Sequence, residues 1–307
     1  MAKTALLFPG QGAQFPGMVK DFYDAYQETR ELFDQASEVL GYDMKKVVFD
    51  GESLNITEFT QPAMLTASMA IYQVAKPYLP KIDMTAGLSL GEYASLVMAG
   101  CFSFAQVLPL VRKRGLFMQQ AVPAGVGGMS AIIGLEEKIL QEVVRQAGPD
   151  VWMANFNCPG QIVLSGRLGP LAKAKSLATE KGAKMCVDLP LSAPFHTELL
   201  SKAADNLANE LYAMELTPPQ VPILFNVTAE RQDDPRTIKD LLKRQVMSPV
   251  LFQNTLERMQ EMGASTFIEI GPGTSLKSFI KRSTKKTTIV SIDSVEALEK
   301  AIIEWTK

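Results

Sequence analysis

The sequence predicts an α/β protein in which a mostly parallel sheet is covered by helices on both faces and a small second domain is inserted. Two observations support this fold class. Short apolar runs typical of buried strands alternate with longer stretches that repeat apolar residues at helical spacing. Between residues 126 and 192 the order changes to strand, helix, strand, strand, helix, strand, which indicates a compact module of its own.

The first 125 residues contain two predicted strands that each run into a glycine-containing turn. Residues 4–8 (TALLF) precede the turn PGQG, and residues 82–89 end at a serine between two glycines. Apolar residues at helical spacing predict the helices around them. These helices span residues 21–40, 61–79, 92–100 and 103–122.

Residues 126–192 match the ferredoxin-like βαββαβ unit in element order and length. The predicted strands span residues 127–134, 151–157, 162–166 and 184–190, and the helices span 135–148 and 170–182. We therefore predict an inserted domain of residues 126–192 within a larger domain formed by residues 1–125 and 193–307.

The larger domain resumes after the insertion with further helices and strands. The predicted helices span residues 196–214, 237–246 and 252–263, and the predicted strands span 221–227, 265–270 and 287–292. A Gly-Pro-Gly turn at residues 271–273 leads from a strand into another helix. It lacks the lysine and hydroxyl of a phosphate loop, so we interpret it as structural.

Composition excludes several classes of function. With 31 basic and 33 acidic residues the net charge is -2, so no general field favours nucleic acid or an anionic membrane. The three cysteines lack metal-ligand spacing, which favours a reducing compartment and no metal site. The apolar run from Ala5 to Pro9 is too short for a signal peptide, and no run is long enough for a membrane span. We expect a cytoplasmic protein.

The stretch Gly87-Leu88-Ser89-Leu90-Gly91 matches the G-x-S-x-G pattern of a nucleophilic serine. That pattern requires a strand that enters a strained turn and continues into a helix, and both elements are predicted here. The alternative is that Ser89 is an ordinary serine in a glycine-rich loop. The strand and helix favour the catalytic interpretation of Ser89.

His196 is the only histidine in the chain and is therefore the candidate general base. A lone histidine is more often structural, but this one follows a proline-containing loop where the inserted module ends, and active sites favour such junctions. No aspartate stands out as its partner. We therefore expect a Ser-His dyad whose imidazole is oriented by a carbonyl group.

Two glycine- or arginine-containing stretches have competing interpretations. In the predicted helix 103–122, Arg112 or Arg114 could bind a carboxylate in an apolar cleft, or the basic residues could form a solvated face; spacing does not choose between the two arginines. The turn at residues 8–14 (FPGQGAQ) lacks the third glycine of a dinucleotide loop, since position 15 is Phe, so a nucleotide site is disfavoured.

Seven blocks in order along nearly the whole chain resemble the malonyl-CoA:acyl carrier protein transacylase family. The blocks are FPGQGAQ (8–14), TQPA (60–63), GLSLGEYASL (87–96), RGLFMQQAVP (114–123), NFNCPGQIVLSG (155–166), SAPFH (192–196) and IGPG (270–273). The resemblance implies an α/β-hydrolase-like core with a ferredoxin-like insertion, in agreement with the predicted order of elements.

The resemblance also implies roles for individual residues. Ser89 is the expected nucleophile and His196 the expected base, while Arg114 is expected to pair with the carboxylate of malonate. The remaining expected site residues are Gln11 and Leu90, whose backbone N–H groups form the oxyanion hole, Gln245, whose main-chain carbonyl orients the histidine, and the cleft residues Asn157 and Met118. Many family members have histidine before the nucleophile, where this chain has Leu88, which could alter specificity.

The implied reaction transfers malonate from malonyl-CoA to the phosphopantetheine thiol of an acyl carrier protein, through a malonyl-serine ester, for fatty-acid or polyketide synthesis. The resemblance implies no permanently bound cofactor: CoA enters as the substrate thioester and phosphopantetheine arrives on the carrier. We expect a monomer with no nucleic-acid or membrane partner. Two alternatives are a hydrolase that clears acyl groups from carrier proteins and a carrier-binding module without activity.

Overall fold

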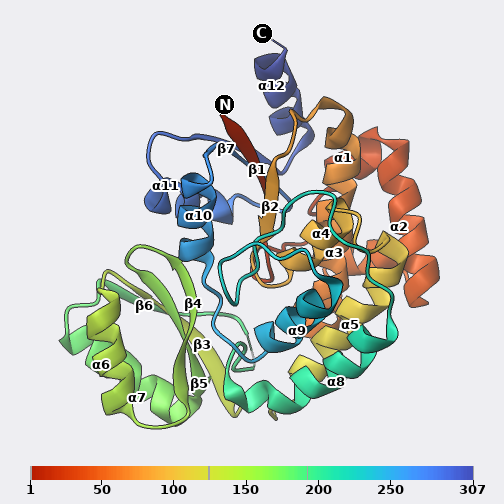
Figure 1. Ribbon diagram of the computed structural model, residues 1–307. Coiled ribbons are helices and arrows are strands. Elements are labelled where there is room, and N and C mark those ends of the chain that lie inside the picture. The colour runs from red at the N-terminus through yellow and green to blue at the C-terminus, as the bar shows by residue number, and fades with distance from the viewer. Residues whose placement is uncertain (1, 124, 192, 307) are drawn as a thin grey trace.

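The computed structural model describes residues 2–123, 125–191 and 193–306, and contains two separate sheets with helices packed against each (Figure 1). Sheet A is parallel in the strand order β2-β1-β7-β8, and sheet B is antiparallel in the order β4-β5-β3-β6. The predicted fold class, a parallel α/β sheet with a small antiparallel βαββαβ unit, is therefore confirmed.

Sheet A is buried on both faces, which explains its continuously apolar strands. Leu6 and Phe8 of β1 pack into the core on one face, whereas Ala5 and Leu7 pack into a second core on the other face. The strands of sheet A are β1 (Lys3–Phe8), β2 (Met84–Gly87), β7 (Ala264–Ile270) and β8 (Thr288–Ile292).

The helices divide between the two faces of sheet A (Figure 1). On the Leu6 face lie α1 (Lys20–Ala25), α2 (Gln27–Leu40), α3 (Thr57–Ala75), α4 (Gly91–Met98), α5 (Phe104–Gln120), α8 (Ser201–Ala213), α9 (Pro235–Gln245) and α12 (Val295–Trp305). On the Leu7 face lie α10 (Phe252–Glu261) and α11 (Ser275–Ser283). Short helical turns occupy Lys46–Asp50, Lys76–Tyr78 and Glu198–Leu200.

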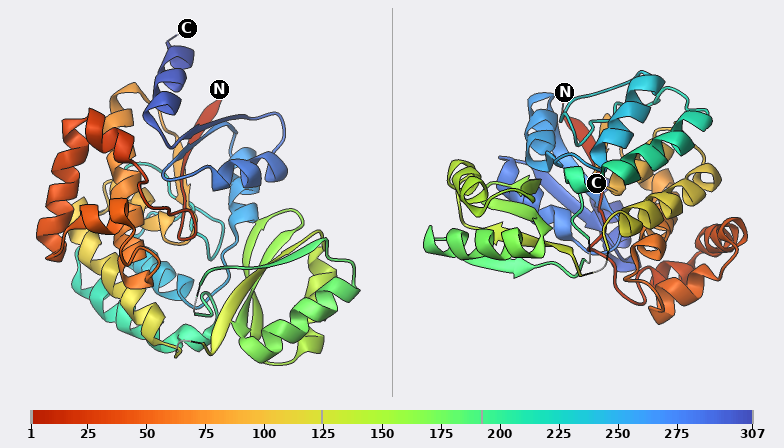
Figure 2. Two further views of the ribbon diagram at one scale, coloured as in Figure 1. Left: turned by 180° about the vertical axis from the view of Figure 1, so that it is seen from behind. Right: turned by 90° about the horizontal axis from the view of Figure 1, so that it is seen from below.

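Sheet B has a core of its own and one face turned toward the larger sheet. Its elements are β3 (Gly127–Ile133), α6 (Glu137–Ala147), β4 (Val151–Cys158), β5 (Gln161–Arg167), α7 (Leu168–Glu180) and β6 (Met185–Asp188). Helices α6 and α7 cover its outer face (Figure 2). Met129, Ala131 and Val163 on the opposite face join the main core. Residue 192, at the predicted domain boundary, lies outside the described residues, and the domain boundaries stay predictions.

The structure differs from the predicted elements in three places. The predicted helix 21–40 is two helices, because Tyr26 is extended and Arg30 donates to the carbonyls of Tyr23 and Asp24 at the end of α1. The predicted strand 221–227 is wrong: this segment forms only two isolated β-bridges, at Ile223 and Leu224, because the chain turns back at Phe225. Helix α12 follows β8 and was not anticipated by the sequence pattern.

Candidate active site

Ser89 lies on a tight turn between β2 and α4, with a positive φ of 50°. Such a backbone conformation is strained for a residue with a side chain and holds the hydroxyl out from the sheet. The flanking glycines allow the chain segments to touch. A Cβ on Gly87 would lie 1.8 Å from the main-chain carbon of Gly91, and a Cβ on Gly91 would lie 2.3 Å from the Phe8 carbonyl oxygen.

Asn226 braces this turn from the segment that follows the inserted module. Its Oδ1 accepts a hydrogen bond from the Ser89 N–H at 2.7 Å, and its Nδ2 donates to the Gly87 carbonyl at 2.7 Å. The side chain is fully buried. Sequence analysis missed Asn226; the only available signal was a polar residue at the end of the apolar run 221–225.

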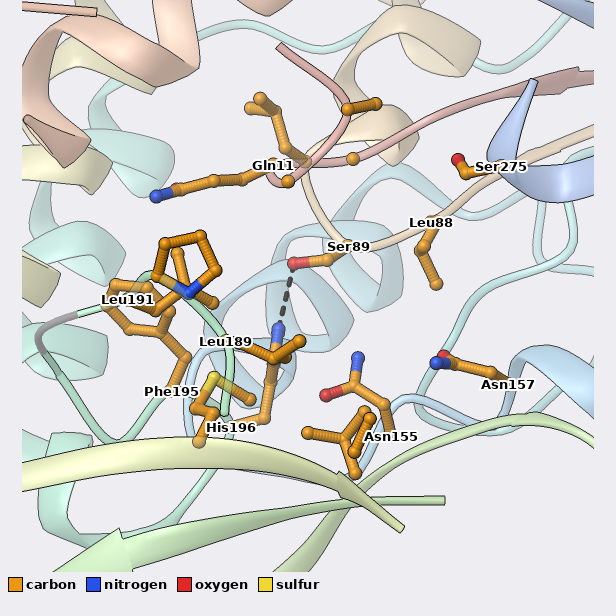
Figure 3. Close-up of a pocket in the computed structure, with 18 of the residues that line it drawn as sticks. Gln11, Leu88, Ser89, Asn155, Asn157, Leu189, Leu191, Phe195, His196 and Ser275 are labelled. Carbon is orange, nitrogen blue, oxygen red and sulfur yellow. Dashed lines mark hydrogen bonds between the residues drawn. The ribbon is translucent and has the colours of Figure 1, made fainter. Parts of the chain in front are cut away.

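The imidazole of His196 connects Ser89 to helix α9. Its Nε2 lies 2.8 Å from the Ser89 Oγ (Figure 3). Its Nδ1 lies 2.7 Å from the Gln245 carbonyl oxygen. Because a carbonyl only accepts, Nδ1 carries the proton and Nε2 is free to accept the serine proton. Burial, together with the charge of Arg114, lowers the pKa of His196 to about 4, so the neutral, basic form predominates at neutral pH.

Arg114 is buried beside Ser89, whereas Arg112 is not part of the site. The Arg114 guanidinium is 1% exposed; Nη1 donates to Gln61 Oε1 at 2.7 Å, and Nη2 donates to Gln245 Oε1 at 2.9 Å and to Ser89 Oγ at 3.2 Å. These partners are all uncharged, and Nε has no partner among the described residues. Arg112 instead forms an ion pair with Glu58 at 2.9 Å.

These side chains open into a pocket of about 230 Å³ between the two sheets. Figure 3 shows Gln11, Ser89 and His196 around it, with Asn155 and Asn157 approaching from sheet B. Of the residues predicted for the site, those that line the pocket are Gln11, Ser89, Leu90, Arg114, Met118, Asn157 and His196. Gln245 lies behind this wall and contacts the site through Ser89, Arg114 and His196.

The backbone N–H groups of Gln11 and Leu90 are among those at the pocket that have no hydrogen-bond acceptor in the described part of the chain. Leu90 is the N-cap residue of α4, so its N–H also lies at a helix N-terminus, where a negative charge is stabilised. The turn that carries Gln11 packs on the Ser89 turn, since a Cβ on Gly10 would lie 2.4 Å from the Leu88 carbonyl oxygen.

The other predicted residues have supporting positions. The Sδ of Met118 accepts a hydrogen bond from Gln61, which in turn holds Arg114. The Oδ1 of Asn157 is buried at the pocket without a partner among the described residues. Leu88 lines the pocket next to Ser89 on the side toward Ser275 (Figure 3).

Sequence analysis missed the part of the wall that comes from α11. Ser275 and Phe279 line the pocket, and the glycine turn before α11 packs against the first glycine turn: a Cβ on Gly271 would lie 2.5 Å from Pro9 Cδ. The structural interpretation of the Gly-Pro-Gly turn agrees with this packing. Because the two turns are far apart in sequence, no local pattern indicates that they meet.

Within residues 2–123, 125–191 and 193–306, no group of three or more histidine, cysteine, aspartate or glutamate side chains is arranged to hold a metal ion. Over the same residues, every helix is too short or too polar to cross a lipid bilayer.

Comparison with known proteins places this geometry among acyltransferases. Residues 5–302 match a family model described as acyl transferase domain. The malonyl CoA-acyl carrier protein transacylase of Bacillus subtilis is 42% identical over 98% of this chain and 97% of its own length. An acyl carrier protein S-malonyltransferase from Vibrio cholerae has a TM-score of 0.94 at 44% identity, covering 98% of this chain and 100% of that one. A malonyl-transacylase in complex with a type II polyketide synthase (PKS) acyl-carrier protein has a TM-score of 0.96 at 37% identity, covering 99% of this chain and 100% of that one.

Proposed function

Because the chain belongs to the malonyl-CoA:acyl carrier protein transacylase family, we propose that its pocket transfers malonate through an ester of Ser89, with His196 as base and Arg114 as carboxylate-binding residue. The chain is an enzyme that moves the malonyl group from malonyl-CoA to an acyl carrier protein, in fatty-acid or polyketide synthesis. The assignment of each step to a residue is the proposal developed below.

One observation carries the proposal: the Ser89 Oγ is in contact with both a base and a buried cation. The His196 Nε2 lies 2.8 Å away, and the Arg114 Nη2 lies 3.2 Å away. In a malonyl ester, a single methylene separates the ester carbonyl from the free carboxylate. A group of this length can therefore be bonded to Ser89 while its carboxylate meets the adjacent guanidinium.

In the first half-reaction, the Ser89 Oγ attacks the thioester carbonyl of malonyl-CoA as His196 Nε2 takes its proton. The N–H groups of Gln11 and Leu90, which have no other acceptor among the described residues, support an oxyanion hole for the intermediate. The carbon–sulfur bond then breaks, His196 returns the proton to the CoA thiolate, and CoA leaves. The product is a malonyl ester of Ser89.

In the second half-reaction, the phosphopantetheine thiol of the carrier attacks this ester. His196 takes the thiol proton, the carbon–oxygen bond to Ser89 breaks, and the proton is delivered to the serine oxygen. Side chains and main-chain N–H groups supply the catalysis of both steps, and phosphopantetheine arrives on the carrier. The two products leave in separate half-reactions, so the kinetics are ping-pong.

Arg114 supports selectivity for malonate over acetate. Its hydrogen-bond partners in the pocket are all neutral, and burial lowers its pKa because the charge is poorly solvated. The malonate carboxylate gives the guanidinium an ionic partner in direct contact, whereas an acetyl group leaves it with neutral hydrogen-bond partners only. We assign Asn157 and Met118 to the substrate side of the pocket on the basis of their lining positions.

A hydrolase on the same scaffold is the alternative, and it differs only in the acceptor, water in place of a thiol. The test is incubation with malonyl-CoA and a panel of carrier proteins from fatty-acid and polyketide systems, in which malonyl-carrier and free malonate are measured together. Transfer predicts that malonyl-carrier accounts for nearly all CoA released. If free malonate is the main product at saturating carrier, the hydrolase function is correct.

A further inference from the structure

A buried carboxyl group lies directly behind the site, on the first turn of the helix that follows Ser89. Glu92 is 1% exposed and touches neither the pocket nor Ser89 Oγ. One carboxylate oxygen accepts a hydrogen bond from the Asn226 N–H and the other from the Gln245 Nε2. Burial raises the pKa of Glu92, whereas the two N–H donors and the charge of Arg114 stabilise its carboxylate form, in which both oxygens are acceptors.

Gln245 lies between Glu92 and the groups that carry out the chemistry. Its Nε2 donates both to Glu92 and to the Ser89 carbonyl, the latter at 3.0 Å. Its Oε1 accepts from Arg114 at 2.9 Å, and its main-chain carbonyl accepts from His196 at 2.7 Å. The side-chain amide therefore has acceptors on one side and a cationic donor on the other.

From these contacts, and resting on the function proposed above, we propose that Glu92 is a positioning residue for malonate selectivity. Its carboxylate holds the Gln245 amide in the orientation that presents Oε1 to Arg114. Arg114 is thereby fixed beside Ser89, where the malonyl carboxylate has to lie. Glu92 acts through Gln245 and touches no reacting atom.

The substitution Glu92→Gln preserves shape and removes one of the two acceptors. The Asn226 N–H belongs to the backbone and cannot turn away, so the new amide has to direct its oxygen there and its Nε2 toward Gln245. Two facing NH₂ groups repel, and the Gln245 side chain relieves this by exchanging its oxygen and nitrogen, at the expense of its hydrogen bond to the Ser89 carbonyl. Its NH₂ group then faces the Arg114 guanidinium, which loses an acceptor and moves from its place beside Ser89.

The test measures kcat/KM for malonyl-CoA and for acetyl-CoA in the parent and in the Glu92→Gln enzyme. The ratio of the two values is independent of how much enzyme is folded, so a merely structural role leaves it unchanged. We expect this ratio to fall about tenfold or more, the effect of losing a hydrogen bond to a charged group. An unchanged or increased ratio overturns the proposal. An increase means that the negative charge of Glu92 only repels the malonyl carboxylate.

A second variant keeps the proposal testable if Glu92→Gln does not fold. Gln245→Met removes the amide but retains the main-chain carbonyl that faces His196, so the malonyl-to-acetyl ratio falls in the same direction. In the double variant, Glu92→Gln with Gln245→Met, the malonyl-to-acetyl ratio falls no further than in the more affected single variant, because Glu92 acts through Gln245. The proposal is contradicted if the fold reductions of the two single variants multiply in the double variant, or if the Gln245→Met enzyme keeps the ratio of the parent.

Glu269 provides a matched control because it is also a fully buried carboxyl group with backbone donors. It accepts from the N–H groups of Leu276 and Lys277 and from Ser291 Oγ, and its hydrogen bonds include none to Arg114 or Gln245. Glu269→Gln is expected to lower stability and leave the malonyl-to-acetyl ratio unchanged. Malonyl transfer by the parent enzyme is measured first, so a failure of the proposed function is seen there, independently of Glu92.

Discussion

The Arg114 Nη2 lies 3.2 Å from the Ser89 Oγ, so the cation that meets the substrate carboxylate and the hydroxyl that attacks the thioester are direct neighbours. Selectivity and chemistry are therefore coupled within one hydrogen bond. We expect a substrate carboxylate that binds Arg114 to compete with this bond and leave the Ser89 hydroxyl bonded to His196. Each prediction below concerns one part of this arrangement.

Ser89→Ala removes the proposed nucleophile. After brief exposure of the parent to malonyl-CoA, mass spectrometry is expected to find one added malonyl group, located on Ser89, and none in the variant. Transfer activity falls by about a thousandfold or more, as for other serine nucleophiles. Ser275→Ala, which alters a different serine of the pocket wall, retains the label. A malonyl group on the Ser89→Ala protein contradicts the mechanism.

Arg114→Ala removes the buried cation and leaves its acceptors in place. We expect kcat/KM for malonyl-CoA to fall by about a hundredfold or more, the size expected for losing a buried charge pair, and kcat/KM for acetyl-CoA to fall far less. Arg112→Ala is the control, because that arginine pairs with Glu58 outside the pocket and its loss leaves the preference intact. An Arg114→Ala enzyme that still prefers malonyl-CoA as strongly as the parent disproves the assignment.

The pH dependence of the two half-reactions is expected to differ. Burial and Arg114 lower the pKa of His196 to about 4 in the free enzyme, so kcat/KM for malonyl-CoA stays level in acid until the pH approaches about 4. In the malonyl-enzyme the substrate carboxylate offsets the charge of Arg114, which raises the pKa of His196. With pantetheine as acceptor, kcat/KM for the thiol therefore falls at a higher pH. The prediction is contradicted if kcat/KM for malonyl-CoA and kcat/KM for pantetheine fall at the same acid pH.

The same lowered pKa predicts an effect on stability. Unfolded His196 takes up a proton near its ordinary pKa of 6.5, whereas the folded residue stays neutral until about pH 4. Its contribution thus lowers the free energy of unfolding as the pH falls through this interval, by about 3 kcal/mol in total. Urea unfolding of the parent and of His196→Gln over this pH range isolates the effect, because the chain has no other histidine. Parallel pH profiles contradict the prediction.

Gly91→Ala tests the close packing under the nucleophile. The added Cβ would lie 2.3 Å from the Phe8 carbonyl oxygen, which belongs to a central strand and cannot move aside. We expect the free energy of unfolding to fall by more than about 2 kcal/mol, measured by urea titration. At Gly169 nothing lies within 4 Å of an added Cβ, so Gly169→Ala stays within about 1 kcal/mol of the parent. Equal urea midpoints for the two variants disprove the packing argument.

Local patterns were sufficient to predict most helices and strands, because the two kinds of element differ in the spacing and length of their apolar runs. The buried run TALLF predicted β1, and helical spacing predicted α3 and α5 within a few residues of their ends. The predicted strand 221–227 failed because an apolar run does not show whether a neighbouring strand continues beside it. Here the chain turns at Phe225 after two bridges.

The residues of the candidate site likewise fall into those that a local sequence pattern indicates and those that it does not. Ser89 was found from its glycines and His196 from being the only histidine. Asn226, Gln61 and the α11 residues Ser275 and Phe279 were missed because no catalytic pattern singles out these positions, although Gln61 lies within the TQPA block. The cytoplasmic location, the monomeric state and the effect of Leu88 stay predictions.

The sequence by itself determined which groups are available for the chemistry: a serine in G-x-S-x-G, one histidine and a pair of candidate arginines. Only the tertiary structure decided their environment. Arg114 is buried against Gln61 and Gln245, which lie 53 and 131 residues away in the sequence, whereas Arg112 pairs with the partly buried carboxylate of Glu58. Burial, desolvation and hydrogen-bond geometry depend on contacts between distant segments, and these set the pKa of His196 and leave Arg114 with neutral hydrogen-bond partners beside Ser89.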